Sequence, residues 1–224
     1  MSAPVSPEPS FSVPPRAFTS GVRAVTRFLT LQYFKTEYRD RHHIPSRGPA
    51  LVIPNHPTYV DPWLVGYGTK RLITWLAWDE AFAWPLVGPF IANLGAIPLN
   101  LERADGTSLR AAYSVLRAGQ LLGVFFEGAR TAAGNFQIND PLPGAARLAL
   151  RTGAPVVPVS VSGARRLWPR DDLVPKRGKV VVTYHPPVDP EAVGRGSQRR
   201  RAELLTGRVA EAVRSALPLD GGVS

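Results

Sequence analysis

The chain has 224 residues, of which 44% are hydrophobic, enough for one sizeable buried core, and we expect a single domain. It contains no cysteine, which excludes disulfides, thiolate metal sites and a cysteine nucleophile. The formal net charge of +10 predicts attraction to polyanions, and both nucleic acid and an anionic membrane surface satisfy that prediction.

The N-terminal part divides into a tail and a helix. Residues 1–15 are rich in proline and serine and lack an apolar core, which predicts a flexible tail rather than a signal peptide, and a cytoplasmic location. Residues 16–40 carry apolar side chains at helical spacing with arginines on the opposite side, the pattern of a basic amphipathic helix. Its apolar stripe either packs on the domain or lies in a membrane interface.

The first aliphatic strand is expected at residues 50–54, and it leads directly into His56. Asp61 and Pro62 are residue types typical of a helix start, so a helix should follow. Taken alone, His56 is most simply a loop histidine and Asp61 a helix cap. Five residues apart at a strand exit, however, the carboxylate can hold one ring nitrogen while the other abstracts a proton.

The middle of the chain alternates between strand and helix patterns. Residues 71–78 and 95–99 read as strands, with a short broken helix at 85–92 between them. The uncharged stretch 81–101 has the length of a membrane span, but prolines, glycines and an asparagine interrupt it. Buried or interfacial structure is therefore the better interpretation.

A helix is expected at residues 107–118, capped by Thr107 or Ser108, and a strand at residues 121–126. A second polar loop, after the one with His56 and Asp61, follows this strand. It places Glu127 and Arg130 beside a glycine, the composition expected for clamping an anionic phosphate. Without other motifs, a surface salt bridge between these two side chains would be the simpler interpretation.

The C-terminal part continues the alternation. We expect a helix at residues 143–152, strands at 154–161 and 178–184, and a basic amphipathic helix at 197–217, followed by a tail at 219–224. The whole pattern predicts an α/β fold with a central, mostly parallel sheet flanked by helices and with ligands at the strand ends.

Four segments in order resemble the motifs of the glycerolipid acyltransferase family, which includes the lysophosphatidate acyltransferases. Residues 55–61 (Asn-His-Pro-Thr-Tyr-Val-Asp) are similar to the first motif, Asn-His-x-Ser-x-x-Asp. Residues 125–131 (Phe-Phe-Glu-Gly-Ala-Arg-Thr) are similar to the third, Phe-Pro-Glu-Gly-Thr-Arg-Ser. Residues 95–103 and 156–161 are looser counterparts of the second and fourth.

Some positions depart from the family pattern. Phe126 and Ala129 replace the proline and threonine of the third motif, and Arg103 comes later than the second-motif arginine usually does. Because related glycerol-3-phosphate acyltransferases also lack that proline, the third motif does not identify the acceptor. Asn55 favours the lysophosphatidate branch, and Thr58 keeps the hydroxyl usually supplied by serine.

The resemblance implies that residues 41–218 form an acyltransferase domain. That domain would move a fatty acyl group from a thioester donor to a hydroxyl of lysophosphatidate, giving phosphatidate. The donor would be either acyl-CoA or acyl-carrier protein. The resemblance implies His56 as general base, with Asp61 holding its other ring nitrogen. Arg130 would bind the acceptor phosphate, and Glu127 would position an acceptor hydroxyl or hold the arginine.

The remaining expected substrate-binding residues are Gly128, which permits close backbone approach, and Arg103, Thr58 and Asn55. No metal or redox cofactor is required by this chemistry. The expected partners are the lipid acceptor, the thioester donor, an anionic membrane surface and acyl-carrier protein, with the protein peripheral or interfacial on the cytoplasmic side of the membrane.

Other functions fit parts of the pattern. The acceptor could instead be glycerol-3-phosphate, another lysophospholipid or a glycolipid, and a related enzyme could transacylate between phospholipids. A non-enzymatic basic module that binds nucleic acid should interleave basic and aromatic residues along a groove. The arginines here concentrate instead in the amphipathic helices at both ends, so no nucleic-acid partner is expected.

Overall fold

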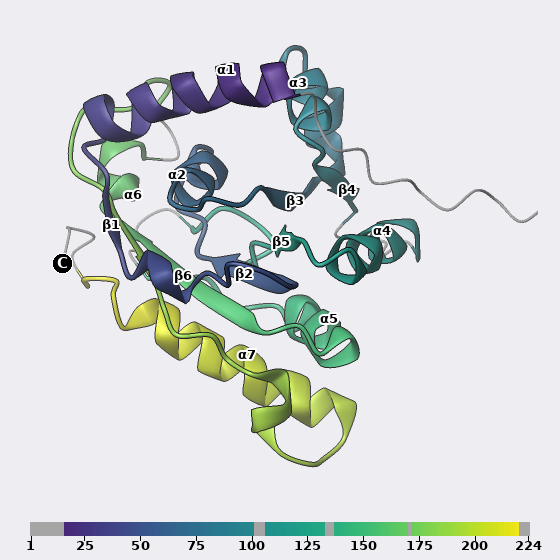
Figure 1. Cartoon of the computed structure of the whole chain (residues 1–224). Coiled ribbons are helices and arrows are strands. Elements are labelled where there is room, and N and C mark those ends of the chain that lie inside the picture. The colour runs from purple at the N-terminus through teal and green to yellow at the C-terminus, as the bar shows by residue number, and fades with distance from the viewer. Residues whose placement is uncertain (1–15, 101–105, 133–136, 170–171, 220–224) are drawn as a thin grey trace, which may run out of the picture.

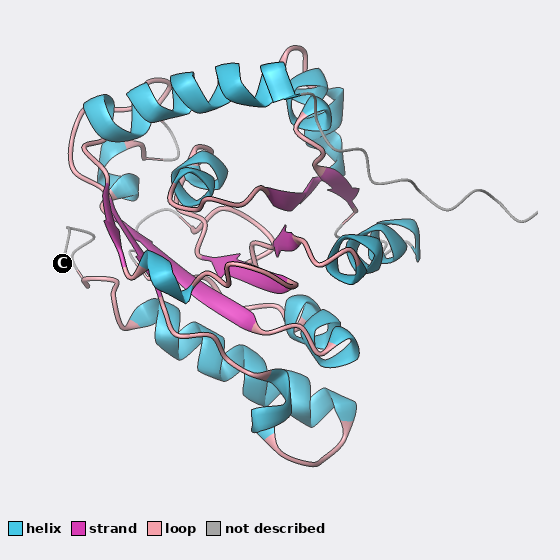
Figure 2. Ribbon diagram, in the orientation of Figure 1, coloured by secondary structure: helices cyan, strands magenta, loops and turns pink. Residues whose placement is uncertain are grey.

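The computed structural model describes residues 16–100, 106–132, 137–169 and 172–219. Within these ranges the chain forms a seven-stranded sheet in the order β1-β7-β6-β2-β5-β3-β4, with helices on both faces (Figures 1 and 2). The expected N-terminal tail and Arg103 lie outside the described residues, as does all but the first residue of the expected C-terminal tail.

The elements follow one another along the chain in the expected alternation. The strands are β1 (Glu37–Arg39), β2 (Ala50–Pro54), β3 (Ile73–Trp78), β4 (Ile97–Leu99), β5 (Leu121–Gly123), β6 (Val156–Ser162) and β7 (Val181–Tyr184). The helices are α1 (Arg16–Arg27), α2 (Asp61–Tyr67), α3 (Val87–Asn93), α4 (Gly106–Arg117), α5 (Gly144–Thr152), α6 (Ala164–Leu167) and α7 (Gln198–Arg214). A π-helical segment at Phe28–Tyr33 and 3-10 turns at Arg41–His43, Asp79–Ala83 and Pro190–Val193 connect them.

Strand β2 lies at the centre and is buried on both faces. Leu51 and Ile53 pack against the layer of α4, α5 and α7, whereas Ala50 and Val52 pack against the layer that contains α2. All four side chains are at most 2% exposed. Because each buried Leu or Ile side chain stabilises the fold by about 2 kcal/mol, this strand is a rigid support for the loop that follows it.

The topology brings the two polar loops to one edge of the sheet. Strand β2 pairs in parallel with β6 and β5, and β5 pairs in parallel with β3. Parallel neighbours end at the same edge, so the loop after β2, which carries His56, meets the loop after β5, which carries Glu127. The expected α/β class and mostly parallel sheet are confirmed.

One strand pair is antiparallel. Ser162 at the end of β6 pairs with Val181 at the start of β7. A parallel return needs a crossover that spans the length of the strand, and the connection between β6 and β7 contains only the one-turn helix α6 within its described residues. Strand β7 therefore runs back along β6, and β1 joins its other side.

The helix expected at residues 16–40 is shorter than its periodicity predicts. Helix α1 ends at Arg27, the π-helical segment continues to Tyr33, and Lys35 has a positive φ of 42°. The chain then becomes extended and β1 pairs with β7. Helical spacing could not reveal this change, because the partner strand lies near the other end of the chain.

Two other boundaries differ from the expectation. Strand β5 ends at Gly123 instead of continuing to residue 126. Helix α4 begins at Gly106, and the Ser108 hydroxyl, expected as a helix cap, donates a hydrogen bond to the carbonyl oxygen of Pro98 at 2.6 Å. The serine thus joins α4 to the end of β4.

The uncharged stretch around α3 does not form one continuous helix. Its described part consists of a 3-10 turn, α3 and β4. In the described ranges, none of the helices combines the length and apolar character needed to cross a membrane.

Candidate active site

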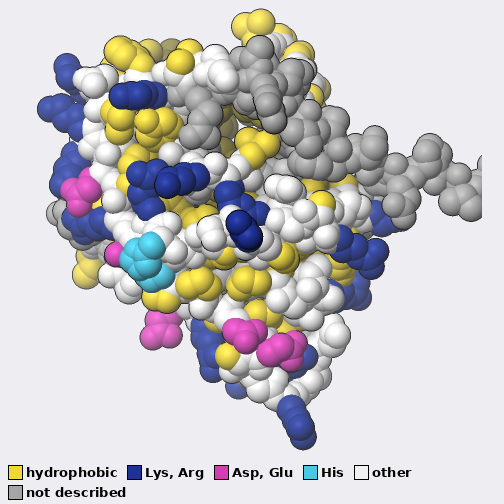
Figure 3. Space-filling view, in the orientation of Figure 1, with side chains coloured by type: hydrophobic (Ala, Val, Ile, Leu, Met, Phe, Trp, Pro, Cys, Tyr) yellow, Lys and Arg dark blue, Asp and Glu magenta, His cyan; other side chains and the backbone are white. Residues whose placement is uncertain are grey.

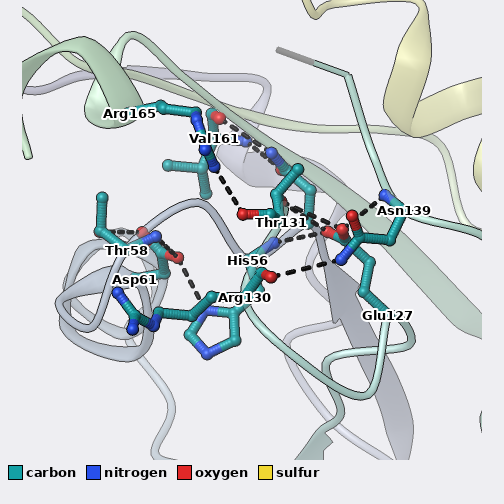
Figure 4. Close-up of polar contacts among 10 residues, drawn as sticks. His56, Thr58, Asp61, Glu127, Arg130, Thr131, Asn139, Val161 and Arg165 are labelled. Atoms are coloured by element: carbon teal, nitrogen blue, oxygen red, sulfur yellow. Dashed lines mark hydrogen bonds and ion pairs between the residues drawn. The ribbon is translucent and has the colours of Figure 1, made fainter. Parts of the chain in front are cut away.

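His56 and Asp61 are hydrogen-bonded to each other at the carboxyl end of β2 (Figure 4). The ring nitrogen Nδ1 of His56 lies 2.8 Å from Oδ2 of Asp61, whose side chain is fully buried. Thr58 donates to the same carboxylate from its amide at 2.7 Å and from its hydroxyl at 2.5 Å. The carboxylate therefore does not cap α2, and it is held on both oxygens.

This pairing determines which ring nitrogen of His56 is available. An ionised carboxylate only accepts hydrogen bonds, so Nδ1 carries the proton and Nε2 keeps a lone pair. Among the described residues, none donates to or accepts from Nε2. The His56 side chain is 17% exposed, and its Nε2 keeps a lone pair for an incoming group.

Glu127 joins the two loops through its buried carboxylate. It accepts hydrogen bonds from the amides of His56 at 2.8 Å and Asn139 at 2.7 Å, and from the Thr131 hydroxyl. Burial raises the pKa of Glu127, while these donors act in the opposite direction. The expected pairing with Arg130 is absent in the described structure, because the carboxylate faces backbone amides instead.

The backbone of the β5 loop is shaped by Gly128 and tied to His56. Gly128 has a φ of +69°, a conformation that favours glycine, and an added Cβ would lie 2.7 Å from a Leu142 methyl group. Further along, the Thr131 amide donates to the His56 carbonyl oxygen at 2.8 Å. The main chain of His56 is thus bonded to this loop through both its N–H and its C=O.

Arg130 extends over the ring of Tyr59. Its guanidinium carbon lies 3.7 Å from the ring centroid, and the ring edge-packs against Trp84 and Trp168. No acceptor within the described parts of the chain takes a hydrogen bond from this guanidinium. A cation that lies over an aromatic ring and keeps unused donors is suited to bind an anion.

Asn55 has a structural position rather than an open one. Its amide group donates to the carbonyl oxygen of Val161 at 3.0 Å and accepts from the Val161 amide at 2.7 Å. The residue is 2% exposed. The expectation that the side chains of Asn55 and Thr58 contact substrate is not supported by this geometry, because their polar atoms are already paired with β6 and Asp61.

Several neighbouring residues were missed in the sequence. Arg165, at the start of α6, is 9% exposed and donates to the Thr131 carbonyl oxygen at 2.6 Å. Asn139 accepts from the Ala132 amide at 2.9 Å. Nothing in the local pattern marks either residue, whereas Tyr59 lies inside the first motif and its aromatic character was a usable signal.

The fold and candidate site together define a class of α/β proteins. Within its described residues, this chain carries a histidine–aspartate pair and an arginine with unused donors at the carboxyl edge of a parallel sheet. The chain belongs to the acyltransferase family, since a model of that family matches residues 35–162, more than half of its length.

The similar proteins have consistent names. A chloroplastic 1-acyl-sn-glycerol-3-phosphate acyltransferase of Brassica napus is 25% identical over 161 residues, covering 70% of this chain and 46% of the relative. The enzyme of that name from Borreliella burgdorferi is 24% identical, with 66% and 59% covered. The chain thus spans about half the length of the curated relatives it matches.

A solved structure matches a larger share of this chain than these two relatives do. The crystal structure of the 1-acyl-sn-glycerophosphate acyltransferase of Thermotoga maritima superposes with a TM-score of 0.64 at 26% identity. The match covers 86% of this chain and 81% of the other.

Proposed function

We propose that this protein transfers a fatty acyl group from a thioester to the free hydroxyl of lysophosphatidate, giving phosphatidate for phospholipid synthesis. The observation that carries the proposal is the Nε2 of His56, held through Nδ1 by buried Asp61 at the same sheet edge as the guanidinium of Arg130, both without a hydrogen-bond partner among the described residues. The printed names of the relatives support lysophosphatidate as the acceptor.

The reaction needs a base because an alcohol is a poor nucleophile near neutral pH. His56 Nε2 accepts the hydroxyl proton as the acceptor oxygen attacks the thioester carbonyl carbon, and a tetrahedral intermediate forms. The carbon–sulfur bond then breaks, and the imidazolium returns the proton to the departing thiolate. Asp61 holds the ring tautomer and stabilises the imidazolium between the two steps.

Arg130 supplies the anion site for the acceptor. The phosphate of lysophosphatidate can accept two parallel hydrogen bonds from one guanidinium, and among the described residues none takes a hydrogen bond from that of Arg130. Glu127 and Thr58 act through His56 and Asp61, whose positions they fix by the hydrogen bonds described above.

The protein would act on a membrane surface, because both substrate and product are lipids. Val25 and Phe28 are each 62% exposed on the helical N-terminal segment, with Arg27 exposed between them. In Figure 3 hydrophobic side chains lie along the upper edge of the molecule, over α1, with Lys and Arg side chains near them. Such a surface suits peripheral attachment to anionic lipid on the cytoplasmic side of a membrane.

The first test is thiol release from palmitoyl-CoA by the wild type, His56→Ala and His42→Ala. His42 is an exposed histidine after β1, at the other edge of the sheet. A general base contributes about a hundredfold to ten-thousandfold, so His56→Ala should lose that much turnover and His42→Ala should lose none. Full activity of folded His56→Ala would refute the assignment of the base.

The acceptor is tested by offering lysophosphatidate, glycerol-3-phosphate and monoacylglycerol separately. Release that requires lysophosphatidate supports the proposal, and release with glycerol-3-phosphate alone moves the protein to the neighbouring branch. Arg130→Ala should impair use of the phosphorylated acceptor far more than use of monoacylglycerol. Palmitoyl-acyl-carrier protein is offered in parallel to identify the donor.

A further inference from the structure

An aromatic column supports the imidazole of His56. The ring of Phe125 is stacked on it, with centroids 3.9 Å apart and planes 21° apart. The remaining face of Phe125 is stacked on the indole of Trp75, with centroids 4.9 Å apart and planes 14° apart. We call Trp75 and Phe125, with the imidazole they support, the aromatic column. It connects β3, the loop after β5 and the loop after β2.

Gly123 makes room for the indole of Trp75, the lowest ring of this column. It pairs with Trp75 in the register of β5 and β3. A Cβ at Gly123 would lie between 2.3 and 2.6 Å from three atoms of the indole, distances that would force the indole to move. The absence of a side chain at this position lets the indole lie across β5 and support Phe125 from below.

The column restricts a motion that Asp61 leaves free. A single hydrogen bond at Nδ1 allows the imidazole to rotate about that bond, which would swing Nε2 away from the acceptor hydroxyl. A flat ring 3.9 Å away opposes that rotation, because tilting the imidazole would break the stacked contact. Two contacts, one at an edge and one on a face, thus define the direction of Nε2.

The column also distinguishes between the two charge states of the ring. The face of an aromatic ring carries partial negative charge, so it attracts an imidazolium much more than a neutral imidazole. In the proposed reaction the imidazole becomes charged as it accepts the hydroxyl proton. An interaction that strengthens at this step lowers the barrier rather than merely tightening substrate binding.

We propose that Phe125, supported by Trp75, is a positioning residue for the general base, which orients the His56 ring and stabilises its protonated form during acyl transfer. This inference rests on the proposed function, in which His56 accepts the proton. It assigns to Phe125 a role in turnover rather than in acceptor binding.

The first experiment compares Phe125→Leu, Phe125→Tyr and Phe126→Leu in the thiol-release assay. Phe126 is the next residue, but it packs in the core on the α5 and α7 side of the sheet, so it controls for the loss of a buried phenyl ring. Phe125→Leu should lower kcat about tenfold with little change in KM for lysophosphatidate. Phe125→Tyr should keep kcat within about twofold, and Phe126→Leu should lower stability but not kcat.

A second series separates charge stabilisation from shape. Phenylalanine, trifluorophenylalanine and pentafluorophenylalanine at position 125 have similar outlines, but fluorine withdraws electrons from the ring face. A stepwise fall in kcat along the series is expected. Equal kcat values across the series, or an unchanged kcat in folded Phe125→Leu, would overturn the inference.

Nuclear magnetic resonance tests the column without substrate. The ring current of Phe125 should move the His56 imidazole proton signals upfield, and Phe125→Leu should remove the displacement. His56 signals that Phe125→Leu leaves unmoved would refute the column even if the proposed acceptor proved wrong.

Discussion

The guanidinium of Arg130 lies over the ring of Tyr59, with its central carbon 3.7 Å from the ring centroid. Arg130 belongs to the loop after β5 and Tyr59 to the loop after β2, so this contact joins the candidate phosphate site to the loop that carries the base. The backbone hydrogen bonds between His56 and the β5 loop join the same two segments. The candidate phosphate site and the candidate base are therefore held in place by one assembly.

Replacement of Tyr59 by leucine should weaken acceptor binding. An exposed cation–π contact is worth about 0.5–1 kcal/mol, so KM for lysophosphatidate should rise about twofold to fivefold with kcat little changed. Tyr59→Phe keeps the ring and should behave like the wild type. Steady-state kinetics with both variants checks this, and a kcat defect without a KM defect would show that Tyr59 acts on the base.

The Asn55 side chain should be important for stability. It exchanges two hydrogen bonds with the Val161 backbone across β2 and β6, and an alanine would leave two buried backbone groups unpaired. We expect Asn55→Ala to lower the free energy of unfolding by about 3 kcal/mol. Asn93→Ala, at an exposed asparagine in α3, should cost under about 0.5 kcal/mol. Urea denaturation of both variants tests the difference.

Local patterns were sufficient to predict the pairing of His56 with Asp61 and most of the sheet. The five-residue spacing of His56 and Asp61 predicted their hydrogen bond, because a strand exit followed by a helix start brings such residues together. The continuous apolar run of strand β2 was equally visible. Each of these features depends on residues that are close in the sequence.

Features that depend on distant pairing could not be predicted. The Asn55 contact requires the register of β2 against β6, and the Arg165 contact requires α6 to fold back over the β5 loop. Strand β1 exists because β7 lies beside it. In each case the fold topology determines the partner. The residue, taken alone in the sequence, is equally compatible with an ordinary loop or helix.

Membrane attachment can be tested at the exposed apolar side chains of the N-terminal segment. Changing both Val25 and Phe28 to serine removes apolar surface without removing a charge, so binding to phosphatidylglycerol vesicles should weaken at least about tenfold. Leu109→Ser, at an exposed leucine of α4, is the matched control and should bind normally. Vesicle sedimentation measures both, and equal binding would exclude this segment as the attachment site.

The buried carboxyl of Glu127 should make stability depend on pH. Burial raises its pKa in the fold above the ordinary value of 4.5. The folded state then holds the proton more tightly than the unfolded state, so the contribution is complete below pH 4.5 and is lost as pH rises through the folded pKa. Relative to Glu127→Gln, which does not titrate, the wild type should lose stability from pH 4 towards pH 8 in urea denaturation. A difference in unfolding free energy between the two proteins that stays constant across this pH range would contradict the expectation.

His185 should produce the opposite slope. Its Nε2 is hydrogen-bonded to the Ser160 hydroxyl at 2.7 Å. Burial lowers the pKa of His185 below the ordinary value of 6.5, and His43 adds a smaller effect in the same direction. Asp40 acts in the other direction. The unfolded chain therefore takes up a proton first, and stability that is complete above pH 6.5 is lost as pH falls through that value towards the lower folded pKa. His185→Gln keeps a donor for Ser160 without titrating, so the wild type should lose stability relative to it between pH 7 and pH 5. A gain in that range would mean that the fold favours the charged imidazole, which the burial of His185 opposes.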